Sequence, residues 1–84
     1  MHYTYIVECA GHTLYTGYTT DLARRVAEHN GSSKGAKYTR TRRPVVLVYS
    51  EMHSTRSEAM KRESAIKHLN RKEKLELIQN KNQQ

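Results

Sequence analysis

The sequence predicts an α+β fold, in which a three-stranded antiparallel sheet is flanked by helices in the order β-β-α-β-α-α. Two short segments rich in Tyr, Thr, Ile and Val lie either side of a glycine turn near the N-terminus, as in a hairpin. A third apolar segment lies at residues 45–51, and two helix-capping signals follow it. With 84 residues, we expect one domain, 1–84, with a modest core.

The first half begins with the hairpin. Strands are expected over residues 3–9 and 13–19, joined by the turn at residues 10–12. Thr20-Asp21 can cap a helix, and Asn30-Gly31 ends it. This N-terminal half therefore supplies two strands and one helix.

The second half begins with a loop. Residues 32–43 carry no periodic apolar pattern and are closed by Pro44, after which the third strand begins. Thr55 and Glu58 have the spacing of a capping box, which predicts a helix to about Leu69.

Asn70 and Glu73 repeat that spacing and predict a last helix through Ile78. The polar tail from about residue 80 is expected to fray.

The charge balance predicts a polyanionic partner. Fifteen Lys and Arg against eight Asp and Glu give a net charge of +7. In a cell the commonest polyanion is nucleic acid. The cations are concentrated in residues 34–43, a segment without acidic residues in which hydroxyl groups and a glycine lie between them. Arg24, outside this segment, is a further candidate phosphate contact. The candidate nucleic-acid-binding residues are Arg24, Lys34, Lys37, Tyr38, Arg40, Arg42 and Arg43.

Several classes of protein are excluded. The single cysteine, Cys9, leaves no internal disulfide and no paired-cysteine zinc site, and the five histidines lack the spacing of a zinc protease. The longest apolar run, residues 45–48, is far shorter than a membrane span. We expect a soluble cytoplasmic protein with no membrane or disulfide partner, either a monomer or a weak dimer that covers one edge of the sheet.

Tyrosine supplies all six aromatic residues, and Tyr5 and Tyr15 lie on the two hairpin strands. A two-residue turn would place them on opposite faces of the sheet. A three-residue turn would pair Tyr5 with Gly17 and bring both tyrosines to one face, with open space at Gly17 beside their hydroxyls. Both registers are compatible with the sequence.

Three charged or titratable residues on the predicted helices have both a structural and a functional interpretation. Arg25 and His29 lie four apart on one helix face, where the guanidinium suits a phosphate and the imidazole can transfer a proton near neutral pH. Each could equally be a solvated side chain. Glu63 lies at the margin of an apolar stripe and has Lys67 four residues later, so an ordinary surface ion pair explains it as well.

The order of these residues resembles the GIY-YIG endonuclease superfamily. Tyr3-Thr4-Tyr5 keeps only the tyrosine of the first signature, whereas Tyr15-Thr16-Gly17 keeps the tyrosine and glycine of the second. Arg25 and His29 match the helix motif, and Glu63 matches the metal-binding glutamate.

The similarity is greatest to the small stand-alone bacterial branch, through residues 14–21, 34–40 and 63–69. Some family members carry a lysine where Tyr18 stands, and larger nucleases carry a later asparagine whose role is not transferred to Asn70.

The resemblance implies hydrolysis of phosphodiester bonds, of DNA in preference to RNA, assisted by a single Mg²⁺ or Mn²⁺ ion held by Glu63. Arg25 would stabilise the transition state, one of Tyr5 and Tyr15 would act on the attacking water while the other holds the phosphate, and His29 would relay the proton. Little sequence specificity is expected, because no DNA-targeting domain is attached. The alternatives are a catalytically weak nucleic-acid-binding module and a basic protein that docks onto RNA–protein surfaces.

Overall fold

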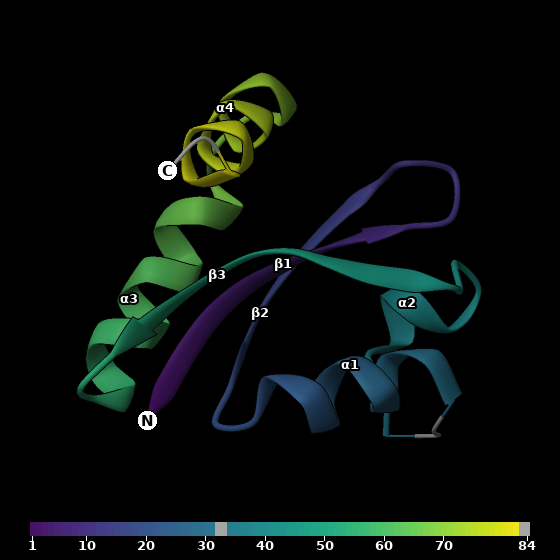
Figure 1. Cartoon of the computed structure of the whole chain (residues 1–84), viewed down its shortest axis with the longest axis horizontal. Helices are drawn as coiled ribbons and strands as arrows, with labels where there is room; N and C mark the ends of the chain where they lie inside the picture. The colour runs from purple at the N-terminus through teal and green to yellow at the C-terminus, as the bar shows by residue number, and fades with distance from the viewer. Residues whose placement is uncertain (32–33, 83–84) are drawn as a thin grey trace.

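The computed structural model describes residues 1–31 and 34–82 of the chain. Its antiparallel sheet has a central strand β1 (His2–Cys9) between β2 (Leu14–Thr19) and β3 (Val45–His53), so the strand order is β2-β1-β3. The predicted α+β class and the order β-β-α-β-α-α are confirmed, with one short helix added inside the segment that was expected to be a loop (Figure 1). The elements are β1 (His2–Cys9), β2 (Leu14–Thr19), α1 (Leu22–Gly31), α2 (Lys37–Arg40), β3 (Val45–His53), α3 (Arg56–Lys67) and α4 (Arg71–Asn82).

Two boundaries differ from the predicted ones because tertiary packing extends the elements. The strand β3 continues to His53, since the central strand β1 remains beside it as far as His2. The last helix continues beyond the predicted Ile78 to Asn82, into the tail that is expected to fray; Lys81 there lies 5.0 Å from the ring centroid of Tyr49. The rest of that tail, residues 83–84, and residues 32–33 of the predicted loop lie outside the described residues.

The helices form two layers, one on each face of the sheet (Figure 1). On one face, Tyr5, Val7 and Cys9 of β1 form a buried cluster against which the partly buried side chains of α1 pack. On the other face, a second cluster joins Ile6, Tyr49 and Ile66 to the apolar side chains of α4. The alternation of side chains along β1 thus separates the core into two halves.

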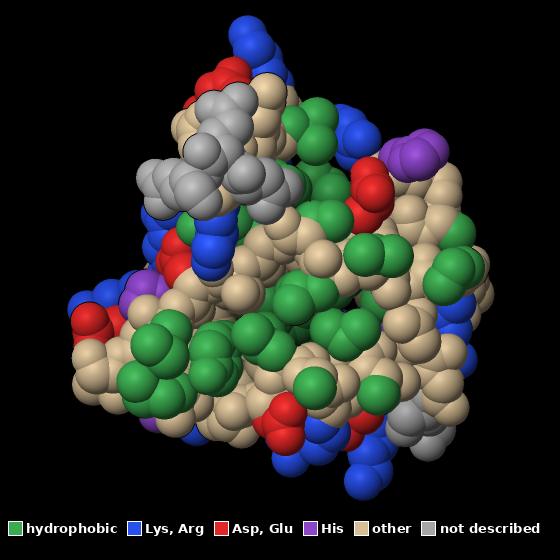
Figure 2. All heavy atoms as spheres, in the orientation of Figure 1, with side chains coloured by type: hydrophobic (Ala, Val, Ile, Leu, Met, Phe, Trp, Pro, Cys, Tyr) green, Lys and Arg blue, Asp and Glu red, His purple; other side chains and the backbone are tan. Residues whose placement is uncertain are grey.

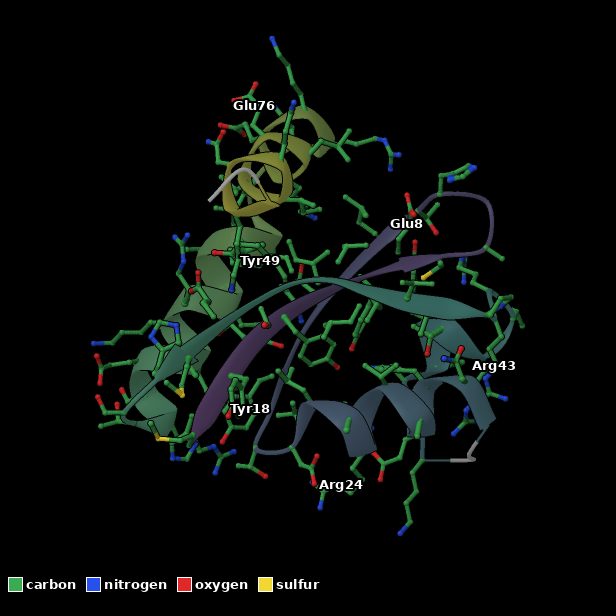
Figure 3. All side chains as sticks on the ribbon, in the orientation of Figure 1. Glu8, Tyr18, Arg24, Arg43, Tyr49 and Glu76 are labelled. Atoms are coloured by element: carbon green, nitrogen blue, oxygen red, sulfur yellow. The ribbon has the colours of Figure 1, made fainter. Side chains whose placement is uncertain are left out.

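A β-bulge interrupts this alternation in β3. The pairing partner changes from Tyr49 opposite Ile6 to Leu47 opposite Val7, so Val48 is the extra residue. As a result, Val48 and Tyr49, although adjacent in β3, both lie on the face covered by α3 and α4. Tyr49 (Figure 3) belongs to the cluster with Ile6 and Ile66, and Val48 packs against that cluster.

Of the two turn lengths compatible with the sequence, the hairpin has the three-residue turn, at residues 10–12. The backbone amide of Cys9 bonds the carbonyl of Thr13 at 2.8 Å, and Tyr5 pairs with Gly17. Gly11 in the turn has a φ angle of 88°, which a glycine adopts without a steric penalty. His12 has a φ of 70°, in the left-handed region that few residues other than glycine adopt. Tyr5 and Tyr15 therefore lie on the same face of the sheet.

The helix starts follow the predicted caps. Asp21 Oδ1 accepts a hydrogen bond from the amide of Arg24 at 3.1 Å. Asn70 and Glu73 form a reciprocal capping box, with bonds of 2.8 and 3.0 Å between each side chain and the other residue's amide. None of the helices in the described part of the chain is long and apolar enough to cross a membrane.

The surface carries its charge unevenly. Figure 2 shows apolar side chains gathered over the middle of one face, with Lys and Arg placed mostly around its margins. The exposed apolar residues of β3 are Val46, Leu47 and Met52. On this face the cations are thus peripheral to β3.

Candidate active site

A hydrogen bond between Tyr5 and His29 forms the centre of the candidate site. Tyr5 comes from the central strand and His29 from the last turn of α1, and both side chains are buried. The Tyr5 hydroxyl lies 2.7 Å from Nε2 of His29. The interpretation of His29 as a solvated helical side chain was therefore wrong, because packing of α1 on the sheet encloses it.

Thr39 determines which nitrogen of His29 carries the proton. The Thr39 hydroxyl lies 2.9 Å from the carbonyl oxygen of Ala36 and 2.9 Å from Nδ1 of His29. A carbonyl oxygen can only accept, so the hydroxyl donates to Ala36 and accepts from Nδ1–H. In neutral His29, Nε2 is then unprotonated and accepts the hydrogen bond from Tyr5.

Tyr15 completes a row of aromatic rings. Its ring meets His29 edge-on at 5.5 Å between centroids and stacks on Tyr38 of α2 at 5.7 Å. The Arg42 guanidinium lies 4.1 Å from the centroid of the Tyr38 ring. The segment that contains α2, predicted to be a loop, therefore forms one wall of the site.

Gly17 allows Tyr5 to lie flat across the edge strand. A Cβ atom at position 17 would lie 2.6 Å from Cζ of Tyr5, closer than real atoms approach. The expectation of open space at Gly17 was wrong, because the phenol ring of Tyr5 itself fills it. The missing side chain thus has a role in positioning Tyr5.

Arg25 connects α1 to the site and to the following loop. One guanidinium nitrogen donates to Glu28 at 3.0 Å and to the carbonyl of Lys34 at 2.8 Å. The side chain is 24% exposed, so it is neither fully solvated nor sealed in the core. Burial raises the pKa of Tyr5, and the positive charge of Arg25 partly opposes that rise.

Glu63 approaches the tyrosines from α3. Its side chain is 15% exposed and lies 3.5 Å from the Lys67 ammonium, so the ion pair considered from the sequence is present. The Lys67 ammonium in turn lies 6.0 Å from the centroid of the Tyr15 ring. Burial is the main cause of the raised pKa of Tyr5, and the negative charge of Glu63 adds to it. Glu63 thus belongs to the same cluster although it comes from the helix layer on the other face of the sheet.

Burial controls the protonation of the central pair. It raises the pKa of Tyr5 to about 12, against the opposing effect of the Arg25 guanidinium. Burial likewise lowers the pKa of His29 below its usual 6.5, and Arg25 reinforces the shift. At neutral pH the pair is therefore a phenol that donates to an uncharged imidazole.

The predicted nucleic-acid-binding residues take different positions. Lys37 and Arg40, at the two ends of α2, and Lys34 just before it are exposed. Arg43 instead points to the end of α1, where its Nε donates to the carbonyl of His29 at 2.5 Å and stabilises the helix terminus. Arg24 lies on the outer side of α1, turned away from the sheet (Figure 3).

Two residues of the site were not predicted from the sequence. Thr39 lies in a segment without periodicity, and nothing in its neighbours indicates that it contacts a histidine ten residues earlier. Lys67 was noticed only as a partner for Glu63, whereas it also lies against Tyr15.

Tyr18 lies on the face of the sheet opposite to Tyr5 and Tyr15, and its hydroxyl lies 2.8 Å from Nδ1 of His2.

Comparison with known proteins assigns nearly the whole chain to one family. Residues 1–76 match the GIY-YIG catalytic domain. A UPF0213 protein from Staphylococcus haemolyticus is 60% identical over 78 residues, which are 93% of this chain and 94% of the relative. A UPF0213 protein from Halobacterium salinarum is 57% identical over 74 residues, covering 88% of this chain and 95% of the relative.

Two solved structures have a similar fold. The solution NMR structure of the UPF0213 protein BH0048 from Bacillus halodurans has a TM-score of 0.62 at 49% identity, covering 95% of this chain and 84% of that one. The NMR structure of the protein EF2693 from E. faecalis has a TM-score of 0.65 at 42% identity, covering 99% and 88%.

Proposed function

This chain belongs to the GIY-YIG catalytic domain family, and on that premise we propose that it is a metal-dependent endonuclease that hydrolyses phosphodiester bonds of nucleic acid, DNA in preference to RNA. The observation that carries the proposal is the convergence of Tyr5, Tyr15, Arg25, His29 and Glu63 from four separate elements. A structural role alone does not require a carboxylate, a guanidinium and two phenols around one buried histidine.

The proton path assigns different roles to the two tyrosines. The hydroxyl of Tyr5 takes a proton from the attacking water while its own proton passes to Nε2 of His29, 2.7 Å away. Tyr5 therefore need not ionise beforehand, which its pKa of about 12 would oppose. Tyr15 has no such acceptor among the described contacts of its hydroxyl, and we assign it to the phosphate.

Arg25 supplies positive charge to the phosphate. The pentavalent transition state carries more negative charge on its equatorial oxygens than the substrate does, so a guanidinium held beside Tyr5 stabilises it selectively. The contacts of Arg25 with Glu28 and Lys34 hold that guanidinium in place before the substrate arrives.

The donor set suits one divalent ion at Glu63. Within the described residues, no group of three or more His, Cys, Asp or Glu side chains could hold a metal, so Glu63 is proposed as a single carboxylate ligand. A single carboxylate is compatible with Mg²⁺ or Mn²⁺, because Mg²⁺ usually retains waters and binds phosphate oxygens as well. Such an ion supplies Lewis-acid stabilisation and a more acidic bound water.

The basic surface beside the site gives affinity without base recognition. Lys34, Lys37 and Arg40 are exposed near Tyr38, and cations of this kind contact phosphates rather than base edges. We therefore expect binding that depends steeply on salt, with little sequence specificity.

The test is cleavage of supercoiled DNA, single-stranded DNA and RNA with Mg²⁺, with Mn²⁺ and with a chelator. We expect Glu63→Gln and Arg25→Ala to lose at least about a hundredfold in rate, as loss of one electrostatic catalytic group does. Glu76→Gln is the matched control, because Glu76 is exposed far along α4 (Figure 3). Cleavage that persists in Glu63→Gln would refute the catalytic assignment.

The second candidate function is a nucleic-acid-binding module with little turnover. The Lys67 ammonium, 3.5 Å from Glu63, favours it, since this cation already neutralises the carboxylate that the metal would need. Salt-sensitive binding by a wild type that cleaves none of the three substrates would support this alternative.

A further inference from the structure

We propose that a pocket at the outer edge of β2 binds the phosphate backbone of the substrate strand, next to the bond that is cut. The pocket has a volume of about 220 Å³ and is lined by Thr13, Leu14, Tyr38, Arg71 and Lys74. The inference rests on the proposed function for its substrate. It gives a binding role to α4, which contributes nothing to the candidate active site.

The pocket and the candidate site share a wall. Tyr38 lines the pocket, and its ring stacks on Tyr15 at 5.7 Å. Leu14, which also lines the pocket, directly precedes Tyr15, and adjacent strand residues advance by about 3.3 Å. The side chains of Leu14 and Tyr15 lie on opposite faces of the sheet, so the pocket and the candidate site meet around the edge of β2, at Tyr38. Successive nucleotides of one strand advance by about 3.4 Å along a helix. A strand held at Tyr15 that passes over Tyr38 at this edge therefore reaches the pocket within a few nucleotides.

The two cations of the pocket have no carboxylate partner. Arg71 and Lys74 are three residues apart on α4, and the salt bridges of residues 1–31 and 34–82 include neither. The neighbouring carboxylate of Glu73 is engaged in the helix cap, 3.0 Å from the amide of Asn70. Glu8, opposite Leu14 in the sheet, is paired with His12. Two cations at one pocket repel each other unless an anion lies between them.

The lining indicates a phosphodiester rather than a base as the ligand. Arg71 and Lys74 supply the charge, and the hydroxyl-bearing residues Thr13 and Tyr38 supply neutral donors. The Tyr38 ring is already in contact with Tyr15 and with the Arg42 guanidinium, so a base could stack on it only by displacing one of these groups. Recognition through the backbone alone agrees with the low sequence specificity proposed above.

Lys67 joins the pocket to the candidate site. Its ammonium lies 6.0 Å from the centroid of the Tyr15 ring, at the end of α3 nearest to α4. Lys67, Arg71 and Lys74 thus provide a succession of cations that begins beside Tyr15 and ends in the pocket. A nucleic-acid strand is a ligand whose charges repeat in the same way.

The experiment compares two double variants that remove equal charge. Arg71→Ala with Lys74→Ala removes the pocket cations, whereas Lys61→Ala with Lys72→Ala removes two exposed cations that line no part of the pocket. The probe is fluorescein-labelled oligothymidine of about 15 nucleotides, within the range that small binding domains cover. Its Kd is measured in EDTA over a series of KCl concentrations, so that no cleavage takes place.

We expect the pocket variant to bind at least about tenfold more weakly, and its log–log salt slope to fall by roughly 0.7 for each phosphate that the variant no longer neutralises. The control variant should change the Kd by less than about threefold. In the wild type, the amide signals of Thr13, Leu14 and Lys74 should shift in NMR spectra when the oligonucleotide is added.

The outcomes separate the pocket from the catalysis. Equal losses of oligonucleotide affinity in both variants, or unchanged amide signals at the pocket, overturn the proposal that the pocket binds phosphate, even if the wild type cleaves DNA. Loss of binding in the pocket variant supports it even if the wild type cleaves nothing, in which case only the nuclease assignment fails. A wild type that binds no nucleic acid overturns both.

Discussion

The hydroxyl of Tyr5 donates to Nε2 of His29 over 2.7 Å, and this bond joins the central strand of the sheet to the end of α1. The direction of the bond follows from Thr39, which accepts from the other ring nitrogen. A strand, a long helix and a short helix thus meet at one imidazole.

Thr39→Val should destabilise the protein by about 1–3 kcal/mol, because Nδ1–H of His29 then becomes a buried donor without a partner. Urea denaturation measures the change. Thr39→Ser keeps the hydroxyl and should recover most of the stability and of the pH–rate profile of cleavage. If the serine variant behaves like the valine variant, the tautomer of His29 is not set by this hydroxyl.

Gly17→Ala should cost about 1–3 kcal/mol through overpacking, because the new Cβ would meet the phenol ring of Tyr5. The cause can be isolated with Tyr5→Leu, which removes the ring. In a double-mutant cycle followed by denaturation, the two changes together should cost less than their sum. Strict additivity would contradict the contact.

Stability should decline at both ends of the pH range. The pKa of His29 is lowered by burial, so below pH 6.5 the unfolded chain binds more protons and the folded state loses stability as the pH falls. Tyr5 keeps its proton to about pH 12 when folded but releases it near 10 when unfolded, so stability also falls from pH 10 to 12.

Thermal melting across this range, with Tyr5→Phe as the comparison, measures the alkaline part. Tyr5→Phe should remove only part of that decline, because burial also raises the pKa of Tyr49. An alkaline decline of the same size in both proteins would contradict the assignment to Tyr5.

Lys67→Gln should leave stability within about 0.5 kcal/mol, since an ion pair whose ammonium is about half exposed to solvent contributes little. It should lower the Mn²⁺ concentration needed to saturate the protein severalfold, because no ammonium then competes for the Glu63 carboxylate. Electron paramagnetic resonance of free Mn²⁺ measures this, with Lys61→Gln as a control that removes an exposed lysine from the same helix. Equal Mn²⁺ binding by both variants would place the metal elsewhere.

The candidate site shows how far local sequence carries a prediction. Arg25 and His29 share a helix face because helical periodicity requires it, and the caps at Asp21 and Asn70 are local hydrogen bonds between near neighbours in the chain. Whether Tyr5 and Tyr15 share a face depended on one residue in the turn. Both registers satisfy the apolar pattern, so only the observed pairing of Tyr5 with Gly17 decides between them.

The sequence by itself determined the order of the elements other than α2, the starts of the three longer helices, the net charge of +7 and the residue types available for catalysis. It could do so because composition, periodicity and capping act over a few neighbouring residues. Only the tertiary structure decided that Thr39 holds His29 and that the Tyr5 ring fills the space at Gly17. It also turned Arg43 to the end of α1 and left Arg71 and Lys74 in a pocket beside Tyr38. These relationships join residues far apart in the chain, and their geometry is set by how the helices pack on the two faces of the sheet.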